Sequence, residues 1–378
     1  MTTKIAIVGC GFVADYYMAT LTNHQNLQLL GATDRDSARA NSFGKNYSVP
    51  IYDSLDTLLS DEKVDIVLNL TNPRSHFEVS LACLQANKHV YSEKPLAVKI
   101  EEAEKLVKLA KEKGLYLASA PCNVLGETAQ TIWKALRENV IGTPRVVYAE
   151  MDDGMVHKMR YQQWLSSTGI PWPYKDEFEV GCTLEHAGYY ITWLTAFFGA
   201  AESLTAYSAC TIPDKQTDVV LEPPHTPDFS VACIQFASGV VARLTCGIVA
   251  PHDHHLKIVG DEGIIFTEDC WDYQSPVYIQ RRLTIRRKTI LNPIKKKYPL
   301  VKKESVFKSF RRNKLMDFCR GVADMANAID RGVSHRLSAD FSLHVNEIVL
   351  AIQNPVETKY PYKLKSSFEP MEPMPWAK

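Results

Sequence analysis

Four side chains that can exchange protons lie within six positions of the segment GCTLEHAGYY, residues 181–190. The segment is typical of one amphipathic helix, on which residues four apart share a face and neighbours are rotated by about 100°. Glu185 and Tyr189 therefore point together, and we predict that they form the proton-handling pair. His186 and Tyr190 fall on an adjacent, mostly aromatic face. We expect His186 to be a packed histidine there, with a catalytic role as the alternative.

A glycine motif, GCGFVA at residues 9–14, directly follows the first apolar run of the chain. Its first glycine permits a tight turn, the second lets the backbone approach a pyrophosphate, and the alanine lets helix and strand pack closely. Asp34, about twenty residues further on, can hydrogen-bond the adenosine ribose and repel the 2′-phosphate of NADP. The adjacent Arg35 can instead hold that phosphate. We predict NAD as the cofactor, with NADP less favoured. The nucleotide-binding residues predicted from this motif and its acid are Gly9, Gly11, Phe12, Val13, Asp34 and Arg35.

A lysine follows another short apolar run in HVYSEKPLA, residues 89–97. If that run is a parallel strand, Lys94 lies at its carboxyl end, where ligands bind in open α/β sheets. A lysine there can hydrogen-bond a substrate hydroxyl and lower the pKa of that hydroxyl. The alternative is an ordinary surface lysine in a strand-to-helix loop.

Together these motifs resemble those of the glucose-fructose oxidoreductase/inositol dehydrogenase/MocA (Gfo/Idh/MocA) oxidoreductases over nearly the whole chain. The resemblance rests on the glycine motif, on TNPRSH at 71–76, on HVYSEKPLA and on the 181–190 helix. It implies that Lys94 reaches the nicotinamide and the substrate, and that the Lys94-Pro95 bond is cis. The cofactor residues that it adds are Thr71, Asn72, His76, Glu93 and Lys94.

The chain departs from the common family pattern on this helix, an Asp followed four residues later by a His. It carries Glu185 and Tyr189 there, and some family members are similar in having a tyrosine. A phenol with a pKa near 10 is a poor base unless a nearby cation lowers its pKa, and Lys94 is the expected cation. The predicted catalytic set is therefore Lys94, Tyr189 and Glu185, with Glu185 orienting the substrate or Lys94.

Two predicted domains must position these residues. Up to about residue 122, short β-branched runs alternate with helical stretches, which predicts an α/β fold with a doubly wound parallel Rossmann sheet over residues 1–122. After this point, longer runs alternate apolar with polar residues. They predict an α+β domain for substrate binding and oligomerisation over residues 123–378, with a large, mainly antiparallel open sheet. Helices are expected around 307–331 and 338–354, and the tail can return to the first domain.

Composition narrows the class of protein. Lys+Arg and Asp+Glu number 43 each, and 46% of the 378 residues are hydrophobic, which favours a soluble globular protein without nucleic-acid or membrane partners. The nine cysteines are scattered without a C-x-x-C pair, as expected for reduced thiols in a cytoplasmic protein. The N-terminal apolar run is too short for a signal peptide, and no run approaches the roughly twenty residues of a membrane span.

Three further clusters have more than one interpretation. The aromatic, proline-rich loop 159–178 can stack on a sugar or simply pack against itself. His252, His254 and His255 in PHDHH resemble metal ligands, but no companion cluster accompanies them, so we predict no metal. The segment 281–314 carries fourteen basic residues and one acid, and it is either a solvated face or attracts an anionic substrate or partner. The tentative substrate residues are Arg160, Trp172, Tyr174 and His252.

The resemblance implies an NAD(P)-dependent dehydrogenase that acts on a secondary alcohol of a sugar, cyclic polyol or nucleotide sugar. Two alternatives stay open: an NAD-using glycoside hydrolase of the same superfamily, and a sugar-responsive regulator that binds NAD(P) without turnover. Family members commonly pair through the open sheet, so a homodimer or homotetramer is expected.

Overall fold

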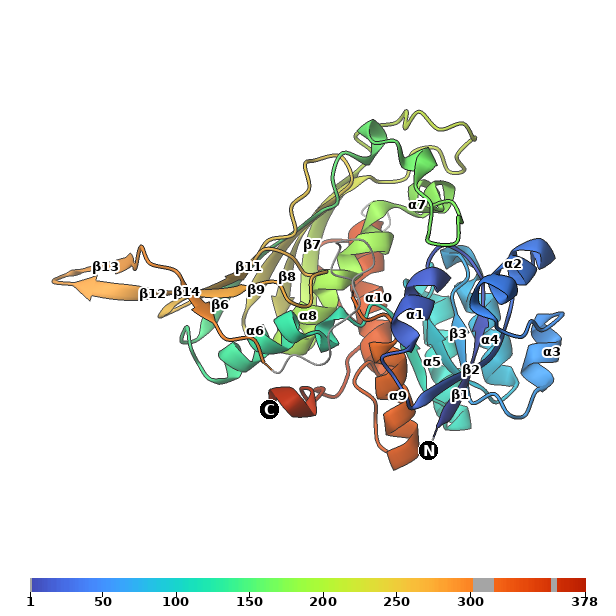
Figure 1. Ribbon diagram of the computed structural model, residues 1–378. Helices are drawn as coiled ribbons and strands as arrows, with labels where there is room; N and C mark the ends of the chain where they lie inside the picture. The colour runs from blue at the N-terminus through green and yellow to red at the C-terminus, as the bar shows by residue number, and fades with distance from the viewer. Residues whose placement is uncertain (1, 302–315, 355–358) are drawn as a thin grey trace.

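The computed structural model describes residues 2–301, 316–354 and 359–378 (Figure 1). The N-terminal half contains the strands β1 Thr3–Val8, β2 Leu27–Thr33, β3 Ile66–Asn69, β4 His89–Ser92 and β5 Leu117–Ser119. Its helices are α1 Ala14–Leu21, α2 Ser37–Tyr47, α3 Leu55–Ser60, the short η1 Pro73–Ser75, α4 His76–Gln85 and α5 Ile100–Lys113. The strands are parallel and lie in the order β2-β1-β3-β4-β5. The predicted Rossmann sheet is confirmed.

Burial of both faces explains why these strands are mostly apolar. Along β1, Ile5 and Ile7 belong to one hydrophobic core, whereas Ala6 and Val8 belong to a second core on the opposite face. β1 pairs with β2 on one side and with β3 on the other, so the order in which successive strands join the sheet reverses at β1. A ligand site is expected beside such a switch point, at the carboxyl ends of the strands.

The second sheet has ten strands. Their bounds are β6 Pro144–Asp152, β7 Ala201–Ala209, β8 Phe229–Phe236, β9 Val241–Gly247, β10 Leu256–Gly260, β11 Gly263–Thr267, β12 Val277–Ile285, β13 Lys288–Leu291, β14 Lys296–Tyr298 and β15 Tyr362–Lys363. They lie in the order β13-β12-β11-β10-β6-β9-β8-β7-β15, with β14 beside β12. Among the described strands of this second sheet, only β6 and β9 pair in parallel, which confirms the predicted, mainly antiparallel sheet.

Helices cover one face of this sheet, among them α6, η5, α8 and α10. The helices of this part of the chain are η2 Asn123–Leu125, α6 Glu127–Arg137, η3 Val156–Lys158, η4 Tyr161–Gln163, α7 Tyr174–Val180, η5 Thr183–Ala187, α8 Gly188–Phe198, α9 Arg320–Arg331, α10 Ala339–Gln353 and η6 Pro375–Ala377. Alternate residues of β8, such as Ile234 and Phe236, are buried, and the ring of Phe236 lies 5.8 Å from that of Phe198 on α8. The long helix α10 contacts α5 on one side and α8 and β7 on the other (Figure 1). It therefore fastens the two halves together.

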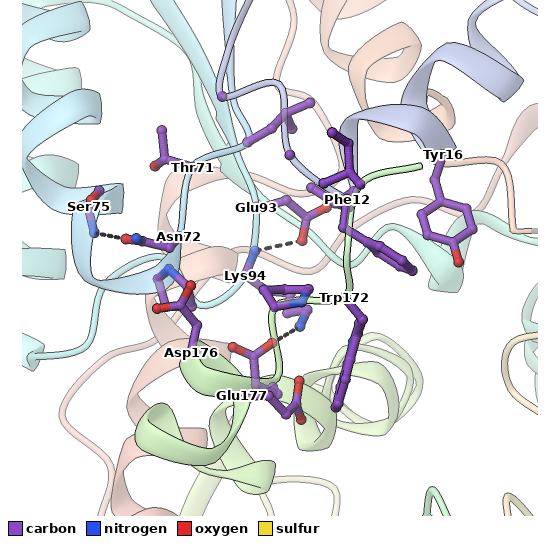
Figure 2. Close-up of a pocket in the computed structure, with 18 of the residues that line it drawn as sticks. Phe12, Tyr16, Thr71, Asn72, Ser75, Glu93, Lys94, Trp172, Asp176 and Glu177 are labelled. Carbon is purple, nitrogen blue, oxygen red and sulfur yellow. Dashed lines mark hydrogen bonds and ion pairs between the residues drawn. The ribbon is translucent and has the colours of Figure 1, made fainter. Parts of the chain in front are cut away.

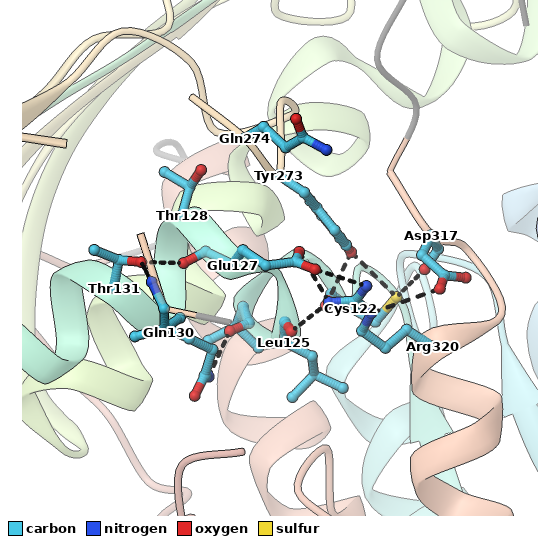
Figure 3. Close-up of polar contacts among 12 residues, drawn as sticks. Cys122, Leu125, Glu127, Thr128, Gln130, Thr131, Tyr273, Gln274, Asp317 and Arg320 are labelled. Atoms are coloured by element: carbon cyan, nitrogen blue, oxygen red, sulfur yellow. Dashed lines mark hydrogen bonds and ion pairs between the residues drawn. The ribbon is translucent and has the colours of Figure 1, made fainter. Parts of the chain in front are cut away.

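A buried polar network reinforces this junction (Figure 3). The Arg320 guanidinium lies 3.0 Å from the Glu127 carboxylate and 3.6 Å from that of Asp317. Asp317 in turn lies 2.9 Å from the His24 imidazole in the N-terminal half. Removing one partner from a buried pair of this kind typically costs about 3–5 kcal/mol, so the network holds the two halves in a defined orientation.

The last part of the chain differs from the prediction in one respect. Residues 316–319 are not helical, and α9 begins only at Arg320 instead of near residue 307. The Cys319 amide donates to the Thr20 hydroxyl, and the Cys319 thiol lies near the Tyr17 carbonyl. These contacts with α1 hold residues 316–319 in a non-helical conformation. Residues 302–315 lie outside the described residues. None of the described helices is long and apolar enough to cross a bilayer.

Candidate active site

A cavity of about 1430 Å³ lies between the two halves (Figure 2). Pockets for a single small molecule usually enclose about 300–1,000 Å³, so this one has room for a nucleotide and a second ligand. One wall consists of loops at the carboxyl ends of the parallel strands, and the other comes from the segment 164–189 and from the loops around Asp153, His252 and Asp269. The predicted cofactor residues all line this cavity: Gly9, Gly11, Phe12, Val13, Asp34, Arg35, Thr71, Asn72, His76, Glu93 and Lys94.

The two motif glycines meet different constraints. Gly9 has a φ of +98°, and a Cβ added there would lie 2.7 Å from the Leu70 carbonyl, so the turn requires glycine. A Cβ added at Gly11 would meet no described protein atom within 4 Å. The backbone at Gly11 therefore faces open space beside the start of α1, which suits a pyrophosphate at a helix N-terminus.

The acid after β2 is held by the backbone. Asp34 accepts hydrogen bonds from the amides of Cys10 at 2.8 Å and Asp36 at 2.9 Å. Arg39, from the first turn of α2, lies 3.7 Å from the same carboxylate, and both Arg35 and Arg39 line the cavity. A carboxylate for a ribose hydroxyl and two guanidinium groups for a phosphate thus meet at one end of the cavity.

The turn that carries Lys94 is fixed by buried groups on both sides. Glu93 accepts from the Tyr17 hydroxyl at 2.8 Å and from the Lys94 amide at 3.1 Å. The buried His76 places one ring nitrogen 2.6 Å from the Pro95 carbonyl and the other 3.1 Å from the Thr71 carbonyl. His76 thereby ties together the two loops that border the cofactor side of the cavity. The predicted cis Lys94-Pro95 bond is present.

The segment that holds Glu185 was predicted to be a regular α-helix, and this prediction is wrong. Residues Thr183–Ala187 form a π-helical turn that leads into α8. A π turn closes its hydrogen bonds from i to i+5 and is wider than an α turn, so side chains are redistributed around it. Glu185, His186 and Tyr189 all line the cavity as a result, whereas Tyr190 is buried and donates to the His254 carbonyl.

Lys94 and Glu185 form an ion pair across the cavity, in which the Lys94 ammonium donates to the carboxylate. Burial lowers the pKa of Lys94, but Glu185 together with Tyr189, Glu177 and Glu93 outweighs burial and raises that pKa above its usual range. Burial raises the pKa of the Tyr189 phenol, and the opposing effect of Lys94 is smaller. Lys94 lowers the pKa of Tyr189 as expected, but burial of the phenol outweighs that effect, so the pKa lies above its ordinary value and not below it. Both Lys94 and Tyr189 are protonated at neutral pH.

His186 is buried and paired, as expected, but it also faces the cavity. Its Nε2 lies 2.8 Å from Glu177 Oε1, and its Nδ1 lies 3.6 Å from Asp153 Oδ2. Burial lowers the pKa of His186, while Glu177 and Asp153 raise it, and the result is a pKa of about 9. His186 is therefore an imidazolium held between two carboxylates at neutral pH.

Three of the four predicted substrate residues line the cavity, and one does not. Trp172, Tyr174 and His252 line the cavity, whereas Arg160 is exposed and lies away from it. The Trp172 ring also packs against Trp164 at 5.0 Å, so the loop both faces the cavity and packs against itself. None of the described basic residues between 281 and 301 lines the cavity; part of this segment forms the β12–β13 hairpin, which projects away from the parallel sheet (Figure 1).

The aromatic loop is fastened to the Rossmann half. Asp15 on α1 accepts from the Thr168 amide at 2.9 Å and from the Thr168 hydroxyl at 2.8 Å. This contact holds the loop, whose residues Trp164 and Ile170 line the cavity, against α1. Asp15 has no recognisable signal in the sequence, because its partner lies 153 residues away in the chain.

Several cavity residues had no sequence signal of their own. They are Tyr16, Arg39, Asp153, Asp176, Glu177, Asp269, Trp271 and Phe318. Most are single acids or aromatics in loops that only the tertiary fold brings together. Arg39 lies in the first turn of α2, five residues after Asp34, and so is close in sequence to the acid that follows the glycine motif.

Comparison with known proteins identifies the family to which both parts of the chain belong. Residues 3–120 match the profile described as "Oxidoreductase family, NAD-binding Rossmann fold", and residues 129–266 match the GFO/IDH/MocA C-terminal domain. The trans-1,2-dihydrobenzene-1,2-diol dehydrogenase of Bos taurus is 25% identical over 276 residues, which cover 72% of this chain and 76% of the bovine enzyme.

Two solved structures share the fold. A UDP-N-acetylglucosamine 3-dehydrogenase from Acidithiobacillus ferrooxidans aligns with a TM-score of 0.69 at 19% identity, over 94% of this chain and 98% of that one. A 3-ketoreductase from Actinomadura kijaniata, in complex with NADP, aligns with a TM-score of 0.70 at 20% identity and the same coverage. The two profiles together match more than half of the chain. This protein is therefore an NAD(P)-dependent oxidoreductase of the GFO/IDH/MocA family.

Proposed function

We propose that the chain is a dehydrogenase, or in the reverse direction a ketoreductase, for a secondary alcohol of a sugar, cyclic polyol or nucleotide sugar. The observation that carries the proposal is that Lys94 meets Glu185 and Tyr189 from the opposite wall, in the same cavity that contains the glycine motif. A proton-handling group and a nucleotide site must share a cavity if a carbinol carbon and its oxygen are to react together.

The roles of the side chains follow from their protonation. Bound beside Lys94, NAD(P) would supply the hydride chemistry. In carbonyl reduction, the protonated Tyr189 phenol gives its proton to the oxygen that becomes the hydroxyl group. The Lys94 ammonium donates a hydrogen bond to the same oxygen and stabilises its developing charge. Glu185 holds the ammonium in position. In alcohol oxidation Tyr189 takes the proton back, which requires its phenolate and is favoured by high pH.

We propose that both NAD and NADP bind and that the adenosine end sets the balance between them. Asp34 favours the free ribose hydroxyls of NAD, while Arg35 and Arg39 can neutralise the 2′-phosphate of NADP. The sequence predicted a preference for NAD from Asp34 despite the neighbouring Arg35. The second guanidinium group, that of Arg39, removes the reason to favour NAD over NADP. The related 3-ketoreductase, which binds NADP, supports keeping both nucleotides.

The substrate class is supported by the cavity wall and by the relatives. Trp172, Trp271 and Tyr174 present aromatic surface to the cavity, beside the acids Asp176 and Glu177. Aromatic faces bind the apolar face of a sugar ring, and carboxylates accept hydrogen bonds from its hydroxyl groups. The names of the solved relatives mention a nucleotide sugar and 3-keto chemistry, whereas the bovine relative is named for a dihydrodiol.

A substrate panel tests the proposal. The purified chain is offered inositols, aldoses, nucleotide sugars and trans-dihydrobenzenediol, each with NAD or NADP, and reduced nicotinamide is measured by absorbance. We expect one molecule of NAD(P)H for each carbonyl formed. Glycoside cleavage without net NAD(P)H would instead favour the NAD-using hydrolase, and nucleotide binding without turnover of any compound would favour the regulator.

A homodimer or homotetramer is part of the same proposal. Tyr207 on β7 is 62% exposed and Val241 on β9 is 40% exposed, on a sheet whose other face is covered by helices. Light scattering on the native chain and on a Tyr207→Glu variant measures the assembly. The variant should dissociate, and an unchanged mass would assign the contact to another surface.

A further inference from the structure

Two histidines and two carboxylates gather beyond Lys94 and Tyr189. Asp153, His252 and Asp269 line the cavity, and His254 is buried beside them. His252 and His254 lie in the connection between β9 and β10, Asp153 directly follows β6, and Asp269 follows β11. These three loops meet because β6, β10 and β11 are consecutive neighbours in the second sheet. The cluster is therefore assembled by the sheet and not by sequence proximity.

The histidine segment is held extended. Asp253 forms an isolated bridge with Asp152, the last residue of β6. Side chains in an extended segment alternate between two sides, so His252 and His254 share one side. His255 takes the other side, where it lies 2.5 Å from the Asp253 carboxylate.

Three possible ligand atoms converge on one point. His252 Nδ1 lies 3.8 Å and His254 Nε2 lies 3.9 Å from the same Asp153 oxygen, Oδ1. All three atoms lie within 4.8 Å of one another. Bonds of about 2.0–2.2 Å to a tetrahedral zinc ion place ligand atoms roughly 3.2–3.6 Å apart, so small side-chain rotations suffice to form such a site.

His254 gives an independent indication of a ligand. Its side chain is completely buried, yet within the described parts of the chain neither ring nitrogen has a hydrogen-bond partner. The closest carboxylate oxygens, at 3.5 Å from Asp269 and 3.9 Å from Asp153, are too distant for a good hydrogen bond. Leaving a buried polar group unsatisfied costs about 1–3 kcal/mol, and a metal bond to Nε2 removes that cost.

We propose that Asp153, His252 and His254 bind a divalent transition-metal ion of the zinc class. Two imidazoles and one carboxylate form an N/O ligand set that suits such ions, whereas Mg²⁺ and Ca²⁺ prefer oxygen ligands throughout. Asp269 completes the arrangement, because it faces Nδ1 of His254 and can accept a hydrogen bond from it while Nε2 binds the metal.

The position of the site gives it a role. Asp153 and His252 line the cavity, so a fourth coordination position opens toward the second ligand. An oxygen atom of the substrate, such as a hydroxyl group of a sugar, would occupy that position. This role rests on the proposed function, but metal binding itself does not. The sequence predicts no metal because no Cys or His cluster accompanies these histidines, whereas the fold adds the carboxylates of Asp153 and Asp269 to them.

A metal titration tests the proposal without substrate or nucleotide. The full chain is freed of metal with a chelator, titrated with Co²⁺ while the ligand-field absorption is recorded, and then challenged with Zn²⁺. We expect one equivalent of Co²⁺ to bind and Zn²⁺ to displace it. His252→Ala, at a side chain that is 56% exposed, should weaken binding by at least about tenfold without unfolding the chain.

His255→Ala is the matched control, because His255 is a neighbouring, exposed histidine outside the cluster. It should leave the affinity unchanged, whereas Asp269→Asn should lower it by about 10- to 100-fold through the orientation of His254. A native chain that binds no Co²⁺ or Zn²⁺, or equal losses in His252→Ala and His255→Ala, would overturn the site. The substrate panel can still succeed in that case, so the two proposals fail separately.

Discussion

Replacing His186 by asparagine should remove a pH-dependent part of the folded-state stability. The imidazolium lies 2.8 Å from Glu177 and 3.6 Å from Asp153, and its side chain is 9% exposed. These carboxylates raise the pKa of His186 from the ordinary 6.5 to about 9. The folded chain therefore holds a proton more tightly than the unfolded chain does.

The size of the effect follows from that rise. Each pKa unit corresponds to about 1.4 kcal/mol, so a change from 6.5 to about 9 is worth about 3 kcal/mol. This stabilisation is fully present below pH 6.5, where both states are protonated, and is lost as pH rises through about 9. His186→Asn should thus be destabilised by a few kcal/mol at low pH and by little above about pH 9.

Urea unfolding of the metal-free native and variant chains across this pH range measures the difference in free energy of unfolding. Subtracting the two curves removes every group that titrates in both proteins. We expect the difference to fall steadily between pH 6.5 and about 9. A difference that does not change with pH would refute the proposal that His186 is a buried imidazolium.

Three further predictions concern the lysine and the nucleotide site. Lys94→Ala should slow turnover by at least about 10²-fold while nucleotide affinity falls little, as measured by steady-state kinetics and fluorescence titration; an active variant would contradict its role. Asp34→Ala should shift binding toward NADP and Arg39→Ala toward NAD, and parallel losses for both nucleotides would contradict the assigned balance. Gly9→Ala should destabilise the fold by about 1–3 kcal/mol in urea, whereas Gly11→Ala should weaken only nucleotide binding, and equal stability losses would refute the distinction.

Local patterns were sufficient to predict the Rossmann half. The glycine turn, the acid after β2 and the lysine after β4 all depend on residues close in sequence, and each of them lines the cavity. The alternating pattern also predicted the antiparallel sheet, since one face of strands such as β8 is buried against helices. These features follow from strand and helix periodicity, which the sequence displays directly.

The rest of the site depends on tertiary contacts. The π turn at Thr183–Ala187 could not be read from helical spacing, and it changes which side chains reach the cavity. Glu177, Asp153 and Asp269 are single acids whose partners lie on other strands or helices. Their effects on His186 and His254 exist only once the second sheet has formed. The pKa of Tyr189 was predicted in the wrong direction for the same reason, because the tertiary fold buries the phenol and burial outweighs the effect of Lys94.

The turnover number of a Tyr189→Phe variant, compared with that of His186→Asn, tests the central claim most directly. The measurement uses the best substrate from the panel at saturating substrate and nucleotide. Tyr189→Phe removes only a hydroxyl group, so we predict turnover slower by about 10²–10⁴-fold with unchanged nucleotide affinity, while His186→Asn stays within about tenfold of the native rate. A Tyr189→Phe enzyme near full speed beside an inactive, folded His186→Asn enzyme would contradict the account and assign the proton transfer to His186.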